Sequence, residues 1–323
     1  MVGTGLRQRE VEDRLLPSVT LRRLIAADGS TIAKVSGSLP DDEPNDLAER
    51  LRGFDITVPS PARMWNYWVG GKDHFAADRE AAERIQAAMP ALPAIARSVR
   101  AFLIEIVHSL TVDYGIRQFL DIGTGLPTAD NTHDVAQRAA PESRIVYADY
   151  DPVVLAHARA LLTSTPEGMT DYIQADLRDT DAILAAAERT LDFSQPVAVL
   201  LIAILHFIPD TDDPYGVVKK LMDAVPAGSF LVICHAPSDI NPEQIAEMTR
   251  RYNESGAEQM RPRSHDEIMR FFDGLDLIPP GLAPLSVWLP PDAQAGAPAD
   301  GQASPPADAR ASASAVAGVA RKP

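Results

Sequence analysis

The feature that most constrains the fold is a regular alternation of short apolar runs with longer amphipathic runs over residues 117–236. Short apolar runs bounded by turn residues are typical of buried strands, whereas apolar residues at three- and four-residue spacings are typical of helices. Strands and helices that alternate in this way pair in parallel through right-handed crossovers. The sequence therefore predicts an α/β fold with a doubly wound, mostly parallel sheet. The expected strands are RQFLDIG, RIVYADY, DYIQADL, VAVLLIAI and SFLVICHA, and the expected helices are DNTHDVAQRAA, PVVLAHARALLT, TDAILAAAERTL and PYGVVKKLMDAV.

Ordered elements are also expected on both sides of this alternation. Helical spacing of apolar residues predicts helices over Asp78–Ala88 and Pro93–Leu110. Residues 275–289, LDLIPPGLAPLSVWL, look like two strands joined by a Pro/Gly turn. Such a pair would give the sheet an antiparallel edge.

The two ends of the chain differ from the centre in composition. Residues 19–35 predict a hairpin with Asp-Gly as its turn, followed by an acidic, linker-like stretch. Residues 291–323 are rich in Ala, Pro, Gly, Ser and Asp and have no aromatic residue, so they are expected to be disordered. The expected organisation is an extension over 1–53, a helical segment over 54–118, an α/β domain over 119–290 and a disordered tail over 291–323.

The composition indicates which classes of molecule the protein can bind and in which cellular compartment it is expected. A net charge of −15 argues against general binding of nucleic acid, because phosphate contacts need clusters of Lys and Arg. The most apolar run, Val197–Ile208, is shorter than the roughly 20 residues of a membrane-spanning helix. One cysteine, Cys234, and the absence of a secretory signal pattern predict a cytoplasmic protein.

Candidate ligand-binding residues follow the first three strands, at the edge of the sheet where doubly wound folds bind their ligands. Asp149, after the second strand, is placed to accept hydrogen bonds from ribose hydroxyls, while Asp151 before Pro152 is expected to cap the next helix. Asp176, after the third strand, is expected to accept from an adenine amine, with the Leu177 amide nearby. Glycines after the first strand would let the backbone approach the ligand. The loop residues expected at the cofactor are Asp121, Gly123, Thr124 and Gly125.

The glycine loop also indicates which nucleoside binds. A dinucleotide places its pyrophosphate on a helix N-terminus served by a third glycine and free amides. Here Pro127 lacks an N–H and Asp130 adds negative charge, which suits a ligand without phosphate. S-adenosylmethionine combines adenosine with a sulfonium and an ammonium group, so an acid such as Asp121 can face it. We therefore expect S-adenosylmethionine as the cofactor.

Three stretches of the chain resemble a known family. The sequences DIGTGLPTADNTHDVAQ, IVYADYDPVVLAHARALL and ARMWNYWVGGKDHFAADREAAERI look like those of actinobacterial S-adenosylmethionine-dependent methyltransferases formerly catalogued as a domain of unknown function. The resemblance runs from about Phe54 to Pro290. It implies a Rossmann-like, class I methyltransferase fold with seven strands, the last antiparallel. His74 departs from the family, which more often has Asn there.

The segment WNYWVGGKDHF holds two of the three tryptophans, Trp65 and Trp68. It is expected to form a lid in which residues 67–72 line the cofactor pocket. In an alternative interpretation, its aromatic side chains anchor an N-terminal helix on the sheet domain. The cofactor contacts expected here and at two strand ends are Tyr67, Gly70, Gly71, Lys72, Tyr150 and Ala203.

Methyl transfer needs donor and acceptor to be held in line, and a general base only if the acceptor loses a proton. His206, after the fourth strand, is the catalytic candidate, against the alternative of a core histidine with its hydrogen bonds satisfied. His235 is a weaker candidate for a base, His133 is expected at the surface or pocket rim, and Cys234 in the core.

The sequence thus predicts a methyltransferase for an unidentified, small-molecule acceptor. No metal-ligand spacing is found in the sequence, and no NPPY motif follows the fourth strand, which disfavours methylation of adenine or glutamine nitrogen. Two other functions remain open at this point, a cofactor-binding sensor without turnover and a nicotinamide dehydrogenase.

Overall fold

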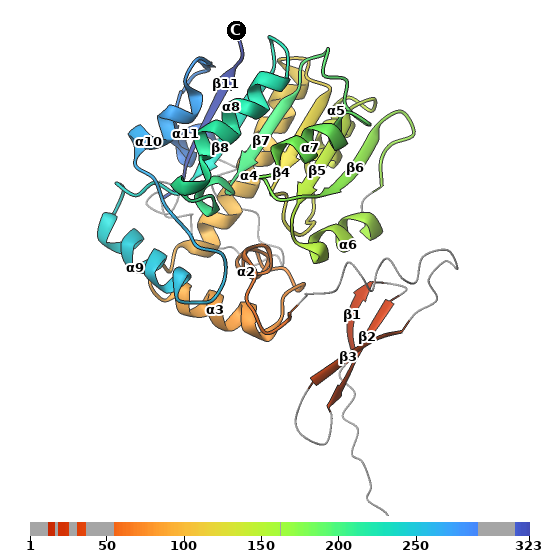
Figure 1. Cartoon of the computed structure of the whole chain (residues 1–323), viewed down its shortest axis with the longest axis vertical. Coiled ribbons are helices and arrows are strands. Elements are labelled where there is room, and N and C mark those ends of the chain that lie inside the picture. Colours follow the sequence, from red (N-terminus) through yellow and green to blue (C-terminus); the bar gives the residue numbers. More distant parts are fainter. Residues whose placement is uncertain (1–11, 17–18, 26–30, 37–54, 162, 290–313) are drawn as a thin grey trace, which may run out of the picture. The chain divides into compact units, whose positions relative to one another are not determined.

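A computed structural model of the chain describes residues 12–16, 19–25, 31–36, 55–161, 163–289 and 314–323 (Figure 1). The chain divides into two compact units, residues 1–54 and residues 55–323. In the first unit, β1 (Glu12–Leu16), β2 (Val19–Ile25) and β3 (Thr31–Ser36) form an antiparallel sheet. The pairing of β2 with β3 confirms the predicted hairpin, whose Asp-Gly turn lies outside the described residues.

The second unit is built on the predicted mixed sheet, whose strand order is β10-β11-β8-β7-β4-β5-β6, with β9 also paired to β11. The central strands pair in parallel, and β11 runs antiparallel to β8, β9 and β10. Strand order reverses between β4 and β7, which makes their carboxyl ends the expected ligand site. The strands are β4 (Gln118–Ile122), β5 (Arg144–Asp149), β6 (Met169–Gln174), β7 (Ala198–Ile202), β8 (Phe230–His235), β9 (Asp276–Leu277), β10 (Ala283–Pro284) and β11 (Val316–Arg321).

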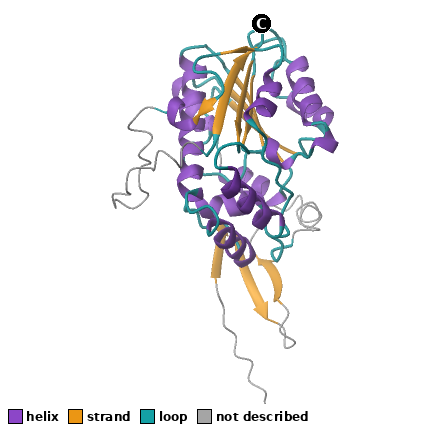
Figure 2. Ribbon diagram, turned by 90° about the vertical axis from the view of Figure 1, so that its left-hand side faces the viewer, coloured by secondary structure: helices purple, strands orange, loops and turns teal. Residues whose placement is uncertain are grey.

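Helices cover both faces of this sheet (Figure 2). Because neighbouring strand residues point to opposite faces, Phe119 and Ile145 join a core shared with α4, while Leu120 and Val146 join a core shared with α7 and α8. The helices are α2 (Pro61–Trp68), α3 (Ala76–Gln86), α4 (Leu92–Val112), α5 (Thr132–Ala139), α6 (Pro152–Leu161), α7 (Thr180–Ala187), α8 (Pro214–Ala224), α9 (Pro242–Asn253), α10 (His265–Met269) and α11 (Leu285–Trp288), with 3₁₀ turns η1 (Leu205–Phe207), η2 (Asp210–Asp212) and η3 (Arg270–Phe272).

The prediction of a disordered tail over 291–323 is wrong for its last residues, which form β11 in the interior of the sheet. Val316 and Val319 are almost fully buried, and a Cβ at Gly318 would lie 2.7 Å from the Phe272 ring. The strand consists of small residues because its neighbours leave little room for side chains. That same composition resembles a low-complexity tail when it is read without the sheet around it.

The two strands predicted in residues 275–289 are confirmed only in part. β9 and β10 have two residues each and pair antiparallel with β11, whereas Leu285–Trp288 forms α11 instead of a strand. The antiparallel partner of the parallel sheet is therefore β11, and these short strands pair with it. Among the described residues, no helix has both the length and the apolar character needed to cross a membrane.

Candidate functional site

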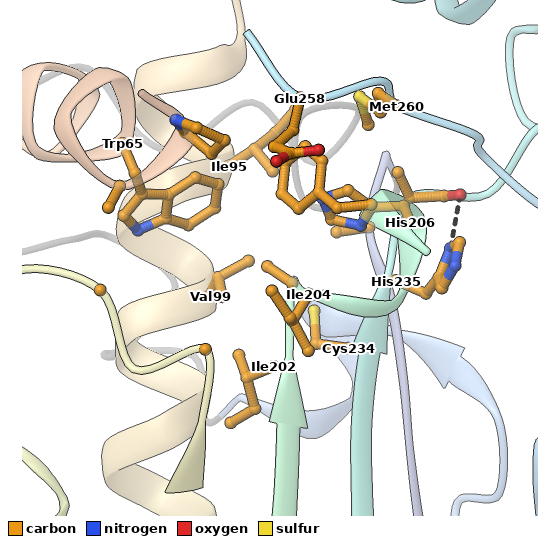
Figure 3. A pocket seen from close by; sticks show the side chains of 18 of the residues that line it. Trp65, Ile95, Val99, Ile202, Ile204, His206, Cys234, His235, Glu258 and Met260 are labelled. Carbon is orange, nitrogen blue, oxygen red and sulfur yellow. Dashed lines mark hydrogen bonds between the residues drawn. The ribbon is translucent and has the colours of Figure 1, made fainter. Parts of the chain in front are cut away.

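A large cavity opens at the carboxyl ends of β4, β5, β6 and β7, beside α2, α4 and α9 (Figure 3). It encloses about 1560 Å³ of space free of protein atoms, including its open mouth. Its charged lining residues are Arg100, Asp121, Asp149, Asp176, Arg178 and Glu258.

The glycine loop after β4 lines the cavity with Gly123, Thr124 and Gly125, as predicted. Gly123 has φ +74°, and a Cβ there would lie 2.7 Å from the Ile204 side chain, so the loop and the end of β7 can meet only with glycine. Gly125 has φ +67°, but a Cβ would meet nothing within 4 Å. The backbone at Gly125 therefore borders open space into which a ligand can come close.

Asp121, at the end of β4, is a nearly buried carboxyl group that lines the cavity. It accepts a hydrogen bond of 2.6 Å from the Thr132 hydroxyl. Burial raises the pKa of Asp121 to about 6, opposed by that hydrogen bond and by the positive charge of Arg100. A cation placed in the cavity would favour the ionised form of this carboxyl group.

Arg100 was not singled out from the sequence. It lies on α4 and donates to the backbone oxygens of Ala129 and Asp130, at 3.0 and 2.9 Å, which holds the end of the glycine loop against the helix. Nothing in the local pattern of α4 marks this residue, because its proximity to Asp121 depends on how the helix packs across the sheet.

Asp149 ends β5 directly beside the glycine loop. Its Oδ2 accepts from the Gly125 amide and its Oδ1 from the Asp151 amide, both at 2.9 Å. Burial raises the pKa of Asp149 to about 6, against the lowering effect of these two hydrogen bonds. A carboxylate has about four lone-pair positions, so Asp149 keeps capacity to accept from a ligand.

Asp151 caps α6, which confirms its predicted structural role. Its Oδ1 accepts from the Val153 amide at 2.9 Å, and its Oδ2 accepts from the Ser60 hydroxyl at 2.8 Å. The second hydrogen bond ties the start of α2 to the strand end that carries Asp149.

Asp176 lines the cavity after β6, but both of its oxygens pair with the Arg178 guanidinium. The hydrogen bonds from Arg178 lower the pKa of Asp176. Arg178 also contacts Asp212 at 3.1 Å. An adenine amine would therefore share the Asp176 carboxylate with this guanidinium. Leu177 and Tyr150 line the same part of the cavity, and burial raises the pKa of Tyr150.

The end of β7 forms a tight turn that faces the glycine loop. Ala203 has φ +58°, an uncommon conformation for a residue with a Cβ, and its amide donates to the Cys234 oxygen at 3.0 Å. Both Ala203 and His206 line the cavity, as Figure 3 shows for His206.

His206 is not a core histidine with its hydrogen bonds satisfied. Its Nδ1 is buried and has no hydrogen-bond partner within the part of the chain that the structure describes. Burial lowers its pKa well below the usual value, and the neighbouring His235 and Arg263 lower it further. The ring is therefore neutral at physiological pH, with unused hydrogen-bonding capacity beside the cavity.

His235 cannot act as a base in this arrangement. Its Nδ1 lies 2.9 Å from the Ala236 carbonyl oxygen, which can only accept, so Nδ1 carries the hydrogen. Its Nε2 then accepts from Arg263 Nη1 at 3.3 Å. Burial is the main cause that lowers the pKa of His235 to about 3. Cys234 is buried as predicted, and burial raises its pKa to about 12.

His133 was expected at the surface or pocket rim, and this is wrong. It is buried in α5, where its amide donates to the Tyr147 hydroxyl at 2.7 Å and its ring contacts the same oxygen. The side chain does not line the cavity. The apolar face of α5 turns it toward the sheet.

The expected lid contributes to the cavity through a different face of α2. Pro61, Ala62, Trp65 and Trp68 line the cavity, in agreement with one helical face. Of the predicted segment 67–72, Trp68 lines the cavity, whereas the four residues singled out as cofactor contacts do not. Tyr67 points instead to Glu83, to which its hydroxyl donates at 3.1 Å. The predicted residues outside the cavity lining are Tyr67, Gly70, Gly71 and Lys72.

Gly71 is required for packing. A Cβ at Gly71 would lie 2.3 Å from the Asn66 side chain, whose Oδ1 accepts from the Asp73 amide. Met64 and Trp68 belong to the hydrophobic core, so the anchoring interpretation of this segment also applies. Among the described residues, no group of three or more His, Cys, Asp or Glu side chains is arranged to hold a metal ion.

Residues 48–323 match the protein family described as S-adenosyl methyltransferase. The chain is similar to a DUF574 family protein from Streptomyces avermitilis, with 41% identity over 83% of this chain and 100% of that one and a TM-score of 0.76. It is also similar to a putative methyltransferase from Thermobifida fusca, with 33% identity over 88% of this chain and 99% of that one and a TM-score of 0.72. No protein with a curated description matches.

Proposed function

Because the chain belongs to the S-adenosyl methyltransferase family, we propose that its cavity binds S-adenosylmethionine together with a small-molecule acceptor and that it transfers a methyl group between them. Family membership excludes the nicotinamide dehydrogenase that the glycine loop alone left open. The half of the cavity between α2, α4 and α9 is apolar. Concave, mostly apolar pockets are typical of small-molecule sites, which supports a small acceptor.

The observation that carries the cofactor assignment is the presence of two nearly buried carboxyl groups in the cavity that the glycine loop also lines. Asp121 and Asp149 both line the cavity where strand order reverses. A cofactor with ammonium and sulfonium charges suits acidic partners, and ribose hydroxyls suit the free lone pairs of Asp149. The residues present thus fit S-adenosylmethionine.

We assign the remaining contacts by position. The amides of the glycine loop border the amino-acid end, and Tyr150 and Leu177 border the nucleoside end. Tyr67, Gly70, Gly71 and Lys72 support the cavity through α2 and the turn that follows it.

S-adenosylmethionine supplies an electrophilic methyl group on a sulfonium. The protein's own contribution is to hold the acceptor in line with that group and to exclude water from the apolar cavity. His206 is the catalytic residue that we propose. Burial and the nearby Arg263 keep its ring neutral, so its role is to form a hydrogen bond with the acceptor and orient it toward the methyl group.

We expect isothermal titration calorimetry to detect binding of S-adenosylhomocysteine and no binding of NAD. The Asp149→Ala variant should bind S-adenosylhomocysteine about 5- to 150-fold more weakly, because the loss of a buried hydrogen-bond acceptor costs about 1–3 kcal/mol. Asp223→Ala, on an exposed face of α8, is the matched control and should leave affinity unchanged. Equal affinity for the wild type and Asp149→Ala would contradict the assignment. An acceptor screen for S-adenosylhomocysteine formation separates turnover from a sensor role.

Cofactor affinity should also depend on pH. The pKa values of Asp121 and Asp149 are about 6 in the free protein, and a cationic ligand favours their ionised forms, so binding lowers these pKa values. Affinity is then constant above about pH 7 and falls as the pH drops through 6. Each carboxyl group contributes up to about tenfold between pH 7.5 and pH 5, so the expected loss is about 10- to 100-fold. Calorimetry across this range tests it, and a flat profile for the wild type would be the contrary result. Asp121→Asn should show a flatter profile than the wild type.

A further inference from the structure

The part of the cavity that faces away from the glycine loop is predominantly apolar. In Figure 3, Trp65 and Val99 lie on one side and His206 and Met260 on the other. A wall of aromatic, branched and thioether side chains favours a ring or another flat apolar group, because such ligands bury large area in a preformed pocket.

Among the described residues that line the cavity, few charged side chains are available to balance the charge of an ionised acceptor. The two lining arginines already have counter-charges, since Arg100 interacts with the Asp121 carboxyl group and Arg178 pairs with Asp176 and Asp212. Glu258 borders the apolar part and would repel an anion. An anionic acceptor would therefore lose its hydration without gaining a counter-charge.

A cationic acceptor is disfavoured on the His206 side. Arg263 is fully buried behind His206 and His235, and its positive charge acts on both rings. That charge opposes a second cation but favours a group that becomes negative during the reaction.

His206 selects a specific functional group. No hydrogen bond to its ring is present within the described residues, and its Nδ1 is buried. A neutral imidazole has one donor and one acceptor nitrogen, and a hydroxyl group can match either. A purely apolar ligand has no hydrogen-bonding group and would leave the His206 ring without a partner.

We infer that the acceptor is an uncharged aromatic compound whose hydroxyl group binds His206 and receives the methyl group as an ether. This inference rests on the proposed function. The acceptor oxygen forms the O–CH₃ bond while the S–CH₃ bond breaks, and the S–CH₃ electron pair remains on sulfur as S-adenosylhomocysteine. His206 holds the hydroxyl group by a hydrogen bond, and the hydroxyl proton is released to solvent as the S–CH₃ bond breaks.

The test uses the full chain saturated with S-adenosylhomocysteine and three probes with the same ring system: 2-naphthol, naphthalene-2-carboxylate and 2-naphthylmethylamine. Calorimetry at pH 7.5 should show 2-naphthol binding at least about tenfold more tightly than the anion and the cation. His206→Leu should weaken 2-naphthol binding by about 3- to 10-fold, the size of one net hydrogen bond. His108→Leu, on an exposed position of α4, is the matched control and should not change it.

The outcomes distinguish a wrong acceptor class from a wrong proposed function. Binding of S-adenosylhomocysteine without 2-naphthol, or equal or tighter binding of either charged probe, overturns the acceptor class and leaves the proposed function intact. Failure to bind S-adenosylhomocysteine overturns the proposed function itself. If His206→Leu does not fold, the comparison of the three probes on the wild type still decides. Unchanged 2-naphthol affinity in a folded His206→Leu variant also overturns the inference.

Discussion

Asp78→Ala is expected to lower the free energy of unfolding of the larger unit by about 3–5 kcal/mol. Asp78 is fully buried in the first turn of α3, where its carboxylate accepts from Arg63 Nε at 2.8 Å and from the amides of Ser60 and Phe75 at 2.9 and 2.8 Å. One side chain therefore joins the beginnings of α2 and α3. Its removal leaves two backbone amides without this acceptor and deprives Arg63 of the ion pair at 2.8 Å.

Urea unfolding followed by circular dichroism measures this loss as a lower midpoint at unchanged slope. Glu80→Ala is the matched control, since Glu80 is an exposed acid on the same helix, and it should stay within about 0.5 kcal/mol of the wild type. In a double-mutant cycle with Arg63→Met, the two changes should cost less together than the sum of their separate effects. Strict additivity, or a loss below about 1 kcal/mol for Asp78→Ala, would refute the assigned role.

Arg263→Met should destabilise the protein by about 2–5 kcal/mol and also disturb the His206 side of the cavity. Arg263 is fully buried and donates to the carbonyl oxygens of Leu205 and Ile208 at 2.8 and 2.7 Å and to Asp210 at 2.9 Å. Methionine fills similar space but leaves the Ile208 carbonyl oxygen without this donor, at about 1–3 kcal/mol, whereas the Leu205 oxygen keeps only the Ile208 amide at 3.2 Å. The segment around His206 then loses its hydrogen bonds to the Arg263 side chain, which lies just before α10.

The neighbouring Arg261 provides a matched control, because it also pairs with Asp210 but lies at the surface. Exposed ion pairs contribute about 0–1 kcal/mol, so Arg261→Met should change stability little. Urea unfolding compares the two variants, and 2-naphthol binding in the presence of S-adenosylhomocysteine reports on His206. Equal stability losses in the two variants would show that burial does not increase the contribution of Arg263 to the free energy of unfolding.

The strand-end residues could be predicted because their positions follow from local sequence. Parallel strands place their carboxyl ends on one edge, so Asp121, Asp149 and Asp176 were expected together, and all three line the cavity. Asp151 could be assigned as a cap because Asp-Pro has a local preference for the start of a helix. These inferences needed only the order of the elements.

Residues that act across elements could not be found in the same way. Arg100 and Arg263 lie far along the chain from the groups that they hold, and the pattern around each is that of an ordinary helix or loop. The choice between Trp65 and Tyr67 as lining residue depends on how α2 is rotated on the domain. A helix pattern shows which residues share a face but not what that face meets.

The sequence by itself determined the alternation of strands and helices, the edge of the sheet at which the cavity lies and the acidic residues at that edge, because each follows from short-range periodicity. Only the tertiary structure decided that residues 316–321 form the antiparallel strand, that the hydrogen bonds of His235 are already used, and that the ring of His206 has unused hydrogen-bonding capacity. The physical reason is that burial and hydrogen-bond partners are set by segments distant in sequence. A strand of alanine, glycine and valine becomes stable only between its neighbours.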